Sequence, residues 1–430
     1  MFKVSRYVVT VPVHHHGERC LAVYQTMTRG LILVPEAAWH RFADHSQHEP
    51  SALDALTRQG FLVGERVDEA HVFQRWRQQF VNDPSVIKSK IIVTRACNNA
   101  CRYCIVEAEP GRMSRQTAQA LDRFMIGLIR ERKPRQVEDN YTGGEPLLNP
   151  RVILESASRR FFFCLGQGID YSFSIVTNGT LLTPSIVSRL KEVGLSGLRV
   201  SIAGPEAIHD SLRPSRTNGK TYRRILENLE AVSGKIPITI ETQYDSGSED
   251  YLRLPEMMDD FQAAGIKVDT ICFTPIIPRR NESRFKSGTG NPQIWLSLMR
   301  EAHGRGYRQF AEPPVNACMA DFTSRMVFDT DGTLIPCVSL QGGEMAYGNV
   351  WKGIDFVAHS QLLRRDFPSE CLNECEILPV CMGGCRFNRL ARNEDFNGVD
   401  CQKPVLRMSL DEYVREAVAS NGHSMEGKPV

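Results

Sequence analysis

From about residue 86 onward, short apolar runs alternate with longer segments of helical periodicity. The expected strands are Ile91–Arg95, Val137–Tyr141, Tyr171–Val176, Leu198–Ile202, Ile236–Thr242 and Val268–Phe273. Between the first two, apolar residues such as Ala118, Leu121 and Met125 recur at helical spacing. This alternation predicts parallel strands covered by helices and joined by right-handed crossovers. Six strands predict an α/β fold with an open, partial (β/α)6 barrel, because a closed barrel of this kind needs eight.

The first 85 residues follow a different pattern. Two β-like runs, Tyr7–Val13 and Leu21–Tyr24, flank the polar stretch 14–17, and helical segments are expected at Ala37–Ala43 and Leu53–Leu62. The histidines at 14–16 could bind a metal, but neighbouring side chains of an extended run point to opposite faces. They are therefore interpreted as an exposed polar turn. The expected domains are an N-terminal α+β module (1–85), the partial barrel (86–305), a cysteine-rich domain (306–405) and a C-terminal helix with a polar tail (406–430).

Composition narrows the possible functions. The 430 residues include 52 Lys and Arg against 50 Asp and Glu, and this near-neutral balance argues against a nucleic-acid-binding protein. No apolar run approaches the ~18 residues of a membrane-spanning helix, and the N-terminus has no secretory pattern. We therefore expect a cytoplasmic protein without a membrane partner. Thiols are kept reduced in the cytosol, so the 13 cysteines point to metal or redox chemistry rather than disulfides.

Three cysteines follow the first predicted strand. Cys97, Cys101 and Cys104 form a CxxxCxxC motif with Tyr103 just before the last cysteine. A structural zinc site would require a fourth protein ligand, which the neighbouring sequence does not offer. An iron–sulfur cluster held by three thiolates instead keeps one iron open for a substrate or cofactor. The spacing therefore indicates a three-thiolate centre.

This motif, after the first strand of a partial barrel, resembles that of the radical S-adenosylmethionine (radical SAM) superfamily. In that family the open iron of a 4Fe–4S cluster binds the amino and carboxylate groups of SAM. Reductive cleavage of SAM gives a 5′-deoxyadenosyl radical that abstracts hydrogen from the substrate. The resemblance implies this chemistry for the present chain, with a flavodoxin or ferredoxin-type protein as the electron donor.

Further motifs resemble the SAM-binding elements of the same family. Glycines 143 and 144 allow close backbone approach to a ligand, and the Glu145 carboxylate is able to accept hydrogen bonds from a ligand ammonium. Relatives usually have an acid where this chain has Ala203. The residues that the resemblance assigns to SAM binding are Tyr103, Gly143, Gly144, Glu145, Pro146, Asn178, Ser201 and Arg213.

Seven more cysteines resemble the SPASM extension of radical SAM enzymes, which carries two auxiliary clusters. By position, the first auxiliary cluster takes Cys318, Cys337 and Cys385, and the second takes Cys371, Cys375, Cys381 and Cys401. The first set is one thiolate short, which suggests an open iron. Three residues separate Cys371 from Cys375, where the family usually has two. The resemblance thus implies three 4Fe–4S clusters, with zinc as the alternative metal. Cys20, Cys164 and Cys272 are interpreted as ordinary thiols, the last two buried.

SPASM enzymes mostly act on peptides, so the resemblance implies a maturase for a ribosomally made precursor peptide. A thioether or a carbon–carbon crosslink is the favoured product, and the N-terminal module could grip the peptide by strand addition. One alternative is an anaerobic sulfatase maturase that forms formylglycine. That group places an aspartate directly after the residue matching Cys337, whereas Val338 cannot accept a proton. The other alternative is a non-catalytic iron–sulfur or zinc protein.

Overall fold

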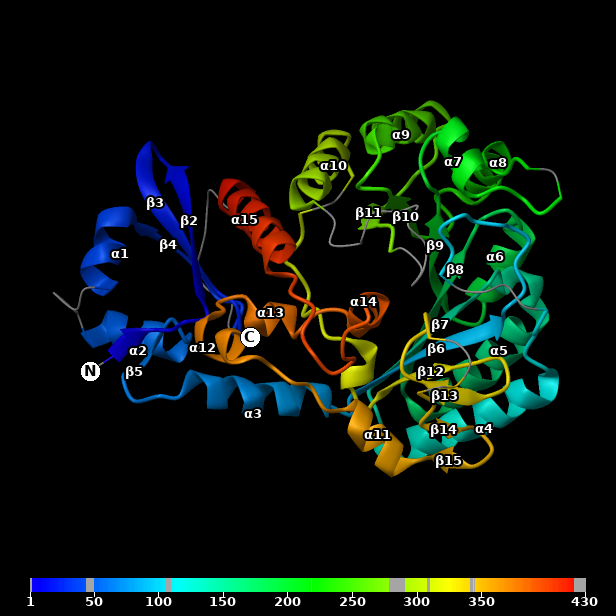
Figure 1. The fold of residues 1–430 in the computed structure, drawn as a ribbon, viewed down its shortest axis with the longest axis horizontal. Helices are drawn as coiled ribbons and strands as arrows, with labels where there is room; N and C mark the ends of the chain where they lie inside the picture. Colours follow the sequence, from blue (N-terminus) through cyan, green and yellow to red (C-terminus); the bar gives the residue numbers. More distant parts are fainter. Residues whose placement is uncertain are drawn as a thin grey trace.

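The computed structural model describes residues 2–43, 50–105, 110–217, 219–277, 291–307, 310–340, 343 and 345–420. At its centre lies a ten-stranded sheet of order β11-β10-β9-β8-β7-β6-β12-β13-β14-β15 (Figure 1). Six neighbouring strands run parallel, and they are β6 (Val86–Thr94), β7 (Gln136–Gly143), β8 (Asp170–Thr177), β9 (Leu195–Ser201), β10 (Ile238–Tyr244) and β11 (Thr270–Pro275). The predicted α/β partial barrel is confirmed.

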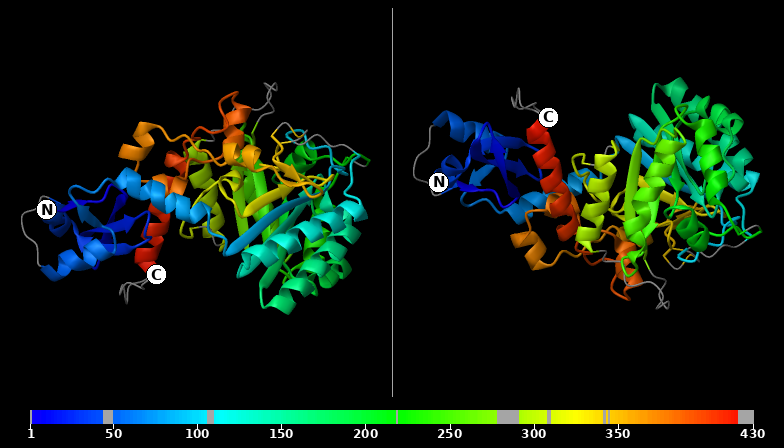
Figure 2. Two further views of the ribbon diagram at one scale, coloured as in Figure 1. Left: turned by 90° about the horizontal axis from the view of Figure 1, so that it is seen from below. Right: turned by 90° about the horizontal axis from the view of Figure 1, so that it is seen from above.

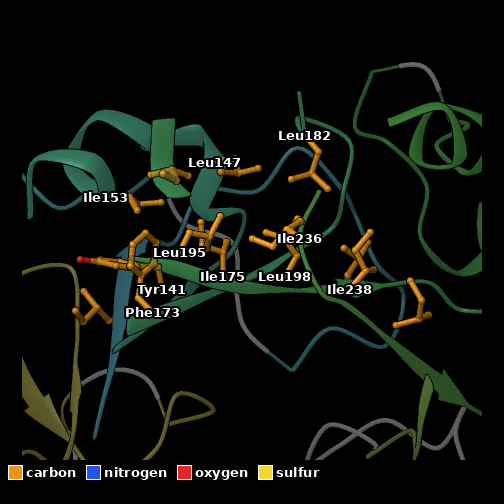
Figure 3. Packing of buried hydrophobic residues seen from close by; sticks show 14 of the residues in the cluster. Tyr141, Leu147, Ile153, Phe173, Ile175, Leu182, Leu195, Leu198, Ile236 and Ile238 are labelled. Atoms are coloured by element: carbon orange, nitrogen blue, oxygen red, sulfur yellow. The ribbon is translucent and has the colours of Figure 1, made fainter. Parts of the chain in front are cut away.

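Helices cover one face of the parallel strands (Figures 1 and 2). They are α4 (Arg115–Arg132), α5 (Pro150–Gln167), α6 (Pro184–Lys191), α7 (Glu206–Leu212), α8 (Tyr222–Val232), α9 (Leu254–Ala263) and α10 (Pro292–Gly304). Alternate strand residues face these helices and are buried, as Figure 3 shows for Tyr141, Phe173 and Ile175 beside Ile153 of α5. Residues alternate between faces along a strand. The residues between the buried ones are mostly polar, so the opposite, concave face carries mostly polar side chains.

Strand β6 begins five residues before the predicted start at Ile91. Lys88, Ser89 and Lys90 interrupt the apolar run, so periodicity alone did not reveal the first half of the strand. Ser89 is buried on the helix side because its hydroxyl donates a 2.6 Å hydrogen bond to Asp139. The two lysines have partly exposed side chains on the concave face.

The N-terminal module contains a three-stranded antiparallel sheet and a separate two-stranded one. The first consists of β2 (Val8–His15), β3 (Glu18–Gln25) and β4 (Leu31–Pro35), and the second of β1 (Phe2–Val4) and β5 (Leu62–Gly64). Its helices are α1 (Glu36–Ala43), α2 (Pro50–Arg58) and α3 (Glu69–Val81). The predicted histidine turn is partly wrong, because His14 and His15 extend β2 opposite Arg19 and Glu18.

The cysteine-rich region extends the central sheet and then returns to the N-terminal module. Strand β12 (Arg325–Phe328) pairs parallel to β6, and β13 (Thr333–Ile335), β14 (Gly348–Asn349) and β15 (Gly353–Ile354) follow antiparallel. The remaining helices are α11 (Phe356–Leu362), α12 (Ser369–Glu374), α13 (Leu378–Cys381), α14 (Arg386–Ala391) and α15 (Lys403–Ser420), and short 3-10 turns lie at Pro146–Leu148 (η1), Glu249–Arg253 (η2) and Met319–Asp321 (η3). The predicted polar tail, from residue 421, lies outside the described residues.

The last described helix packs against the N-terminal sheet. Leu410, Val414 and Val418 of α15 form one buried cluster with Val11 of β2 and Ala22 of β3. Arg407 adds a hydrogen bond from Nη2 to the Thr10 carbonyl, at 2.9 Å. The two ends of the described chain therefore share a core, which the proposed domain boundaries did not anticipate. No helix among the described residues is long and apolar enough to cross a membrane.

Candidate functional site

The predicted cofactor residues lie at the carboxyl ends of neighbouring parallel strands. The loop that follows β6 carries Cys97, Cys101 and Cys104. The glycine pair at the end of β7 packs directly against the start of that loop. Gly144 N–H donates to the Thr94 carbonyl and Glu145 N–H to the Ala96 carbonyl, both at 2.9 Å. A Cβ on Gly143 would lie 2.1 Å from Thr94 O, and one on Gly144 would lie 2.4 Å from Ala96 O. Only glycine permits this contact between the two loops.

Glu145 joins the second loop to the third. Its side chain is fully buried, and its carboxylate accepts hydrogen bonds from Leu147 N–H (3.0 Å), Thr177 Oγ1 (2.8 Å) and Asn178 N–H (2.7 Å). Burial raises the pKa of Glu145 against the lowering effect of these donors. These three donors leave acceptor capacity on Oε2, so a hydrogen bond from a ligand ammonium stays a prediction.

Asn178 links the third loop to the cysteine loop. Its Nδ2 donates to Asn98 Oδ1 at 2.8 Å and lies 3.9 Å from Cys97 Sγ, while its Oδ1 accepts from Thr180. Asn98 Nδ2 in turn donates to Thr180 Oγ1 at 2.8 Å. Asn178 therefore orients the cysteine loop, a role that the sequence did not indicate.

Tyr103 and Arg213 meet between the cysteine loop and β10. Arg213 Nη1 donates to Tyr103 Oη at 2.7 Å, and the same hydroxyl donates to Gln243 Oε1 at 3.0 Å. Arg213 is only 7% exposed. Burial alone would lower the pKa of its guanidinium, but Cys101, Tyr103 and Cys97 raise it above the usual value. Arg213 is therefore a buried cation beside the thiols.

The segment that presents Arg213 is braced by a buried histidine. His209 Nδ1 accepts a hydrogen bond from Ala203 N–H at 3.2 Å, and Nε2 lies 3.0 Å from Thr221 Oγ1. Burial, reinforced by Arg213, holds the pKa of His209 well below its usual range, so the ring is neutral. Ala203 itself packs in an apolar cluster with Tyr103 and Ile276.

The cysteine loop fits a cluster held by three thiolates. Burial raises the pKa of the Cys97 thiol to about 11, while the Asn99 backbone N–H opposes that rise. Within the described residues, the Asn99 side-chain amide and Arg213 Nε are buried without a hydrogen-bond partner. These unused polar atoms suit a polar ligand beside the thiols. Among the described residues, no three Cys, His, Asp or Glu side chains surround a common point as metal ligands do.

The family comparison agrees with this site. Residues 91–242, which run from β6 to β10 and include all eight predicted SAM-binding residues and the three thiols, match the model of the radical SAM superfamily. The chain carries a radical SAM domain. The fold thus implies SAM and a 4Fe–4S cluster as cofactors.

Individual relatives and structures show how far the similarity extends. An uncharacterised protein of Methanocaldococcus jannaschii is 30% identical over 198 residues, which cover 44% of this chain and 63% of the relative. The serine-type anaerobic sulfatase-maturating enzyme of Klebsiella aerogenes is 24% identical over 327 residues, covering 67% and 77%. The crystal structure of Streptococcus suis SuiB bound to precursor peptide SuiA aligns with a TM-score of 0.54 at 14% identity, covering 94% of this chain and 99% of that chain. This neighbour is similar in fold over nearly the whole length of both chains.

The seven cysteines between residues 318 and 401 form two separate groups in the fold. In the first group, both Cys337 and Cys318 act electrostatically on Cys385. Burial raises the pKa of the Cys318 thiol, and Asp321 and Cys337 add to this rise. The three thiols predicted for the first auxiliary cluster therefore lie near enough to influence one another electrostatically. Their metal occupancy stays a prediction.

The second group contains the four other thiols. Burial raises the pKa values of Cys371 and Cys381, and both Cys375 and Cys401 raise them further. Cys381 sits at the end of α13 in the core shared with α15, and Cys401 precedes α15. The extra residue between Cys371 and Cys375 lies within α12, which spans this interval. The grouping therefore coincides with that implied for the second auxiliary cluster, whose metal is likewise a prediction.

A buried ion pair supports the first thiol group. Asp321 is fully buried and accepts hydrogen bonds from Arg386 Nη2 at 2.5 Å, Arg77 Nη2 at 3.1 Å and the Cys318 backbone N–H at 3.0 Å. Arg77 comes from α3, so the N-terminal module contributes a cation to this region. Buried charges of opposite sign held in such a network fix the position of the thiol-bearing backbone.

The concave face holds polar residues that the sequence analysis did not single out. Glu241 of β10 pairs in register with Ser201 of β9 and Cys272 of β11, so these side chains lie in one row across the sheet. Glu241 Oε2 lies 3.5 Å from Arg199 Nη1. The expectation that Cys272 is buried is wrong, because it is partly exposed on this face, whereas Cys164 and Cys20 are buried. The alternation of Thr239, Glu241 and Gln243 could have revealed this face from the sequence.

Proposed function

We propose that the protein is a maturase that uses SAM to abstract hydrogen from a residue of a ribosomally made peptide. A thioether or carbon–carbon crosslink is the favoured product. The observation that carries the proposal is the convergence of the cysteine loop, the glycine loop, Asn178 and Arg213 at one end of the barrel. We assign the SAM-binding cluster to Cys97, Cys101 and Cys104. When bound, the cluster and SAM supply a 5′-deoxyadenosyl radical.

The surrounding residues bind and orient the cofactor in this proposal. Arg213 holds a buried positive charge beside the thiols, which suits the carboxylate of SAM. Gly143 and Gly144 hold the backbone close, Pro146 begins the turn η1 behind them, and Ser201 lies at the end of β9 for contact with the ribose. Tyr103 connects Arg213 to Gln243 and so fixes the guanidinium over the site.

The peptide substrate is supported by the N-terminal module. Its sheet has the order β2-β3-β4, and among the described residues β4 pairs only with β3. An edge strand offers backbone donors and acceptors to an added strand of peptide. The similarity in fold extends over this module, because the SuiB structure with its bound precursor peptide covers 94% of the chain. We propose a flavodoxin or ferredoxin-type protein as the electron donor.

The sulfatase-maturase alternative is favoured by the Klebsiella aerogenes relative. Against it, Val338 packs with Ile92, Val327 and Ile335 in an apolar cluster, where a proton acceptor would be costly to bury. The concave face offers other carboxylates, among them Glu241 of β10 and Glu138 of β7. The products separate the two functions, because formylglycine is an aldehyde that reacts with a hydrazide reagent, whereas a thioether or carbon–carbon crosslink does not.

Anaerobic reconstitution with iron and sulfide tests the proposal and its non-catalytic alternatives. Three 4Fe–4S clusters correspond to about twelve iron atoms per chain. We expect the triple variant of Cys97, Cys101 and Cys104 to alanine to keep about eight and to form no 5′-deoxyadenosine from SAM and dithionite. Cys164→Ala is the control, because this buried thiol of α5 lies in the core. Zinc in place of iron, or no 5′-deoxyadenosine from the wild type, would contradict the proposal.

A further inference from the structure

A cavity of about 280 Å³ lies beside the edge strand of the radical SAM domain. One wall comes from the end of β11 and from α10, with the side chains of Phe273 and Trp295. The opposite wall comes from Asn388 of α14, Cys401 of the segment that follows, and Val405 of α15. The cavity thus lies between the barrel and a thiol of the second auxiliary group. None of the functions assigned above uses it.

The cavity is largely apolar but contains one unused acceptor. Asn388 Nδ2 donates to Asp400 Oδ2 at 2.9 Å, and Asp400 also receives Gln402 Nε2 at 2.6 Å. A carboxylate accepts hydrogen bonds, so the amide nitrogen of Asn388 must face Asp400. This leaves Asn388 Oδ1 buried and without a partner among the described residues. A buried acceptor of this kind is costly unless a donor reaches it.

The size of the cavity limits its occupant. Sites for whole small molecules typically measure about 300–1,000 Å³, so a cofactor as large as SAM does not fit. A single large side chain does. Tyr244, Phe273 and Trp295 provide aromatic walls, which favour an aromatic or large aliphatic group. The unpaired carbonyl of Asn388 favours an occupant with an N–H group close to that side chain, as in a peptide backbone.

The position of the cavity also favours a peptide. Strand β11 pairs only with β10 among the described residues, so its outer edge is open beside the cavity. An extended chain running along that edge places every second side chain on one face. Asn388 also connects the cavity to the first thiol group, since its backbone N–H points to the Cys385 thiol.

We propose that this cavity binds an aromatic or large aliphatic side chain of the substrate peptide, with a peptide N–H donating to Asn388 Oδ1. The proposal rests on the peptide-modifying function above and makes the cavity a specificity pocket. The occupant is one residue of the peptide, held between the radical SAM domain and the auxiliary thiols.

Photolabelling tests the proposal on the anaerobically reconstituted full-length protein. The probe is N-acetyl-4-azido-phenylalaninamide, and labelled residues are mapped by mass spectrometry. We expect labels on the walls containing Trp295 and Val405. N-acetyl-tryptophanamide and N-acetyl-leucinamide should compete, and N-acetyl-glutaminamide should compete about tenfold less well, because its side chain gains little from apolar burial. Labelling outside the cavity, or equal competition by the polar amide, would overturn the proposal.

Two variants make the test specific. Val405→Phe fills the cavity and should reduce labelling about tenfold, whereas Val357→Phe, at a side chain 71% exposed on α11, should not. Asn388→Leu removes the acceptor and should abolish the preference for the probe over its N-methylated analogue, which we expect to be about threefold to tenfold in the wild type. Unchanged labelling of Val405→Phe would contradict the assignment.

The same preparations separate this proposal from the proposed function. Circular dichroism first establishes that each variant is folded. Wild-type 5′-deoxyadenosine formation without any probe tests the radical SAM reaction, and labelling tests the cavity independently of it. Sedimentation addresses the competing occupant. If Val405→Phe dissociates an oligomer and leaves labelling unchanged, the cavity is occupied by a second copy of the chain and the peptide proposal is wrong.

Discussion

Replacing Gly144 by alanine should destabilise the radical SAM domain through backbone contacts alone. The new Cβ would lie 2.4 Å from Ala96 O and 2.6 Å from Arg95 O, and real Cβ contacts essentially never fall below 3.0 Å. The Ala96 carbonyl must therefore retreat by at least 0.6 Å. Neither neighbour is the end of a flexible side chain, so the two loops themselves have to separate.

The cost follows from what that separation breaks. The hydrogen bonds from Gly144 N–H to Thr94 O and from Glu145 N–H to Ala96 O are both 2.9 Å long. A shift of this size lengthens them to about 3.5 Å, where most of their strength is lost. Each contributes about 1 kcal/mol, and overpacking adds about 1–3 kcal/mol. The free energy of unfolding should fall by about 4 kcal/mol, which lowers Tm by roughly 8–16 °C for a domain of this size.

Thermal unfolding of the iron-free protein, followed by circular dichroism, measures this effect without the cofactors. Gly127→Ala is the matched control, because Gly127 lies in helix α4 and a Cβ there meets nothing within 4 Å. This control should raise Tm by about 1–4 °C, since alanine is the better helix former. A Tm for Gly144→Ala within about 2 °C of the wild type would refute the reasoning.

Three further predictions follow from the buried polar groups. Arg213→Lys should weaken SAM binding at least about tenfold in equilibrium dialysis, because a charged hydrogen bond is lost. The control Arg223→Lys, at an exposed ion pair, should bind SAM as the wild type does. Equal affinities of the two variants would contradict the role of Arg213. The pKa of His209 is lowered in the folded state, so its contribution to stability is complete above about pH 6.5 and falls by about 1.4 kcal/mol per pH unit below it. Between pH 7 and pH 5.5, the urea midpoint of His209→Gln should therefore decline less than that of the wild type. Parallel declines of the two proteins would argue against this. Arg160→Met leaves the carboxylates of Asp122 and Asp139 buried without their shared cation and should lower the free energy of urea unfolding by about 3–5 kcal/mol. The control Arg159→Met, at a side chain 36% exposed, should lower it by under about 1 kcal/mol. Similar losses in the two variants would show that burial does not control the cost.

The parallel barrel was predictable because its strands carry continuous signals in the sequence. In β7, Val137 and Tyr141 mark the apolar face, and glycines mark the end of the strand. The two thiol groups followed from the resemblance to the SPASM extension, and their role as metal ligands stays a prediction. Strand β12 was not predictable, since its four residues pair with β6 from more than 200 positions away. No local pattern records such a partner.

The chemistry of the site was predictable by residue type more than by role. Glu145 was expected to accept from a ligand, and the structure adds a second role, because its carboxylate connects two loops within the protein. The sequence shows a carboxylate beside glycines and does not show which donors will surround it. The Asn388 acceptor was also hidden, because its free oxygen depends on Asp400, a contact made by tertiary packing.

The core shared by β2, β3 and α15 has a consequence for synthesis of the chain. The apolar face of β3 ends at Gln25, whereas α15 begins at Lys403. At roughly 5–20 residues per second, the ribosome needs about 20–75 s to cover that interval. During this time Val11, Ala22 and Tyr24 lack the helix that covers them. Until α15 has been synthesised, the nascent chain exposes the apolar face of this sheet. We expect chaperones to bind that face during this interval and to be released once α15 covers it.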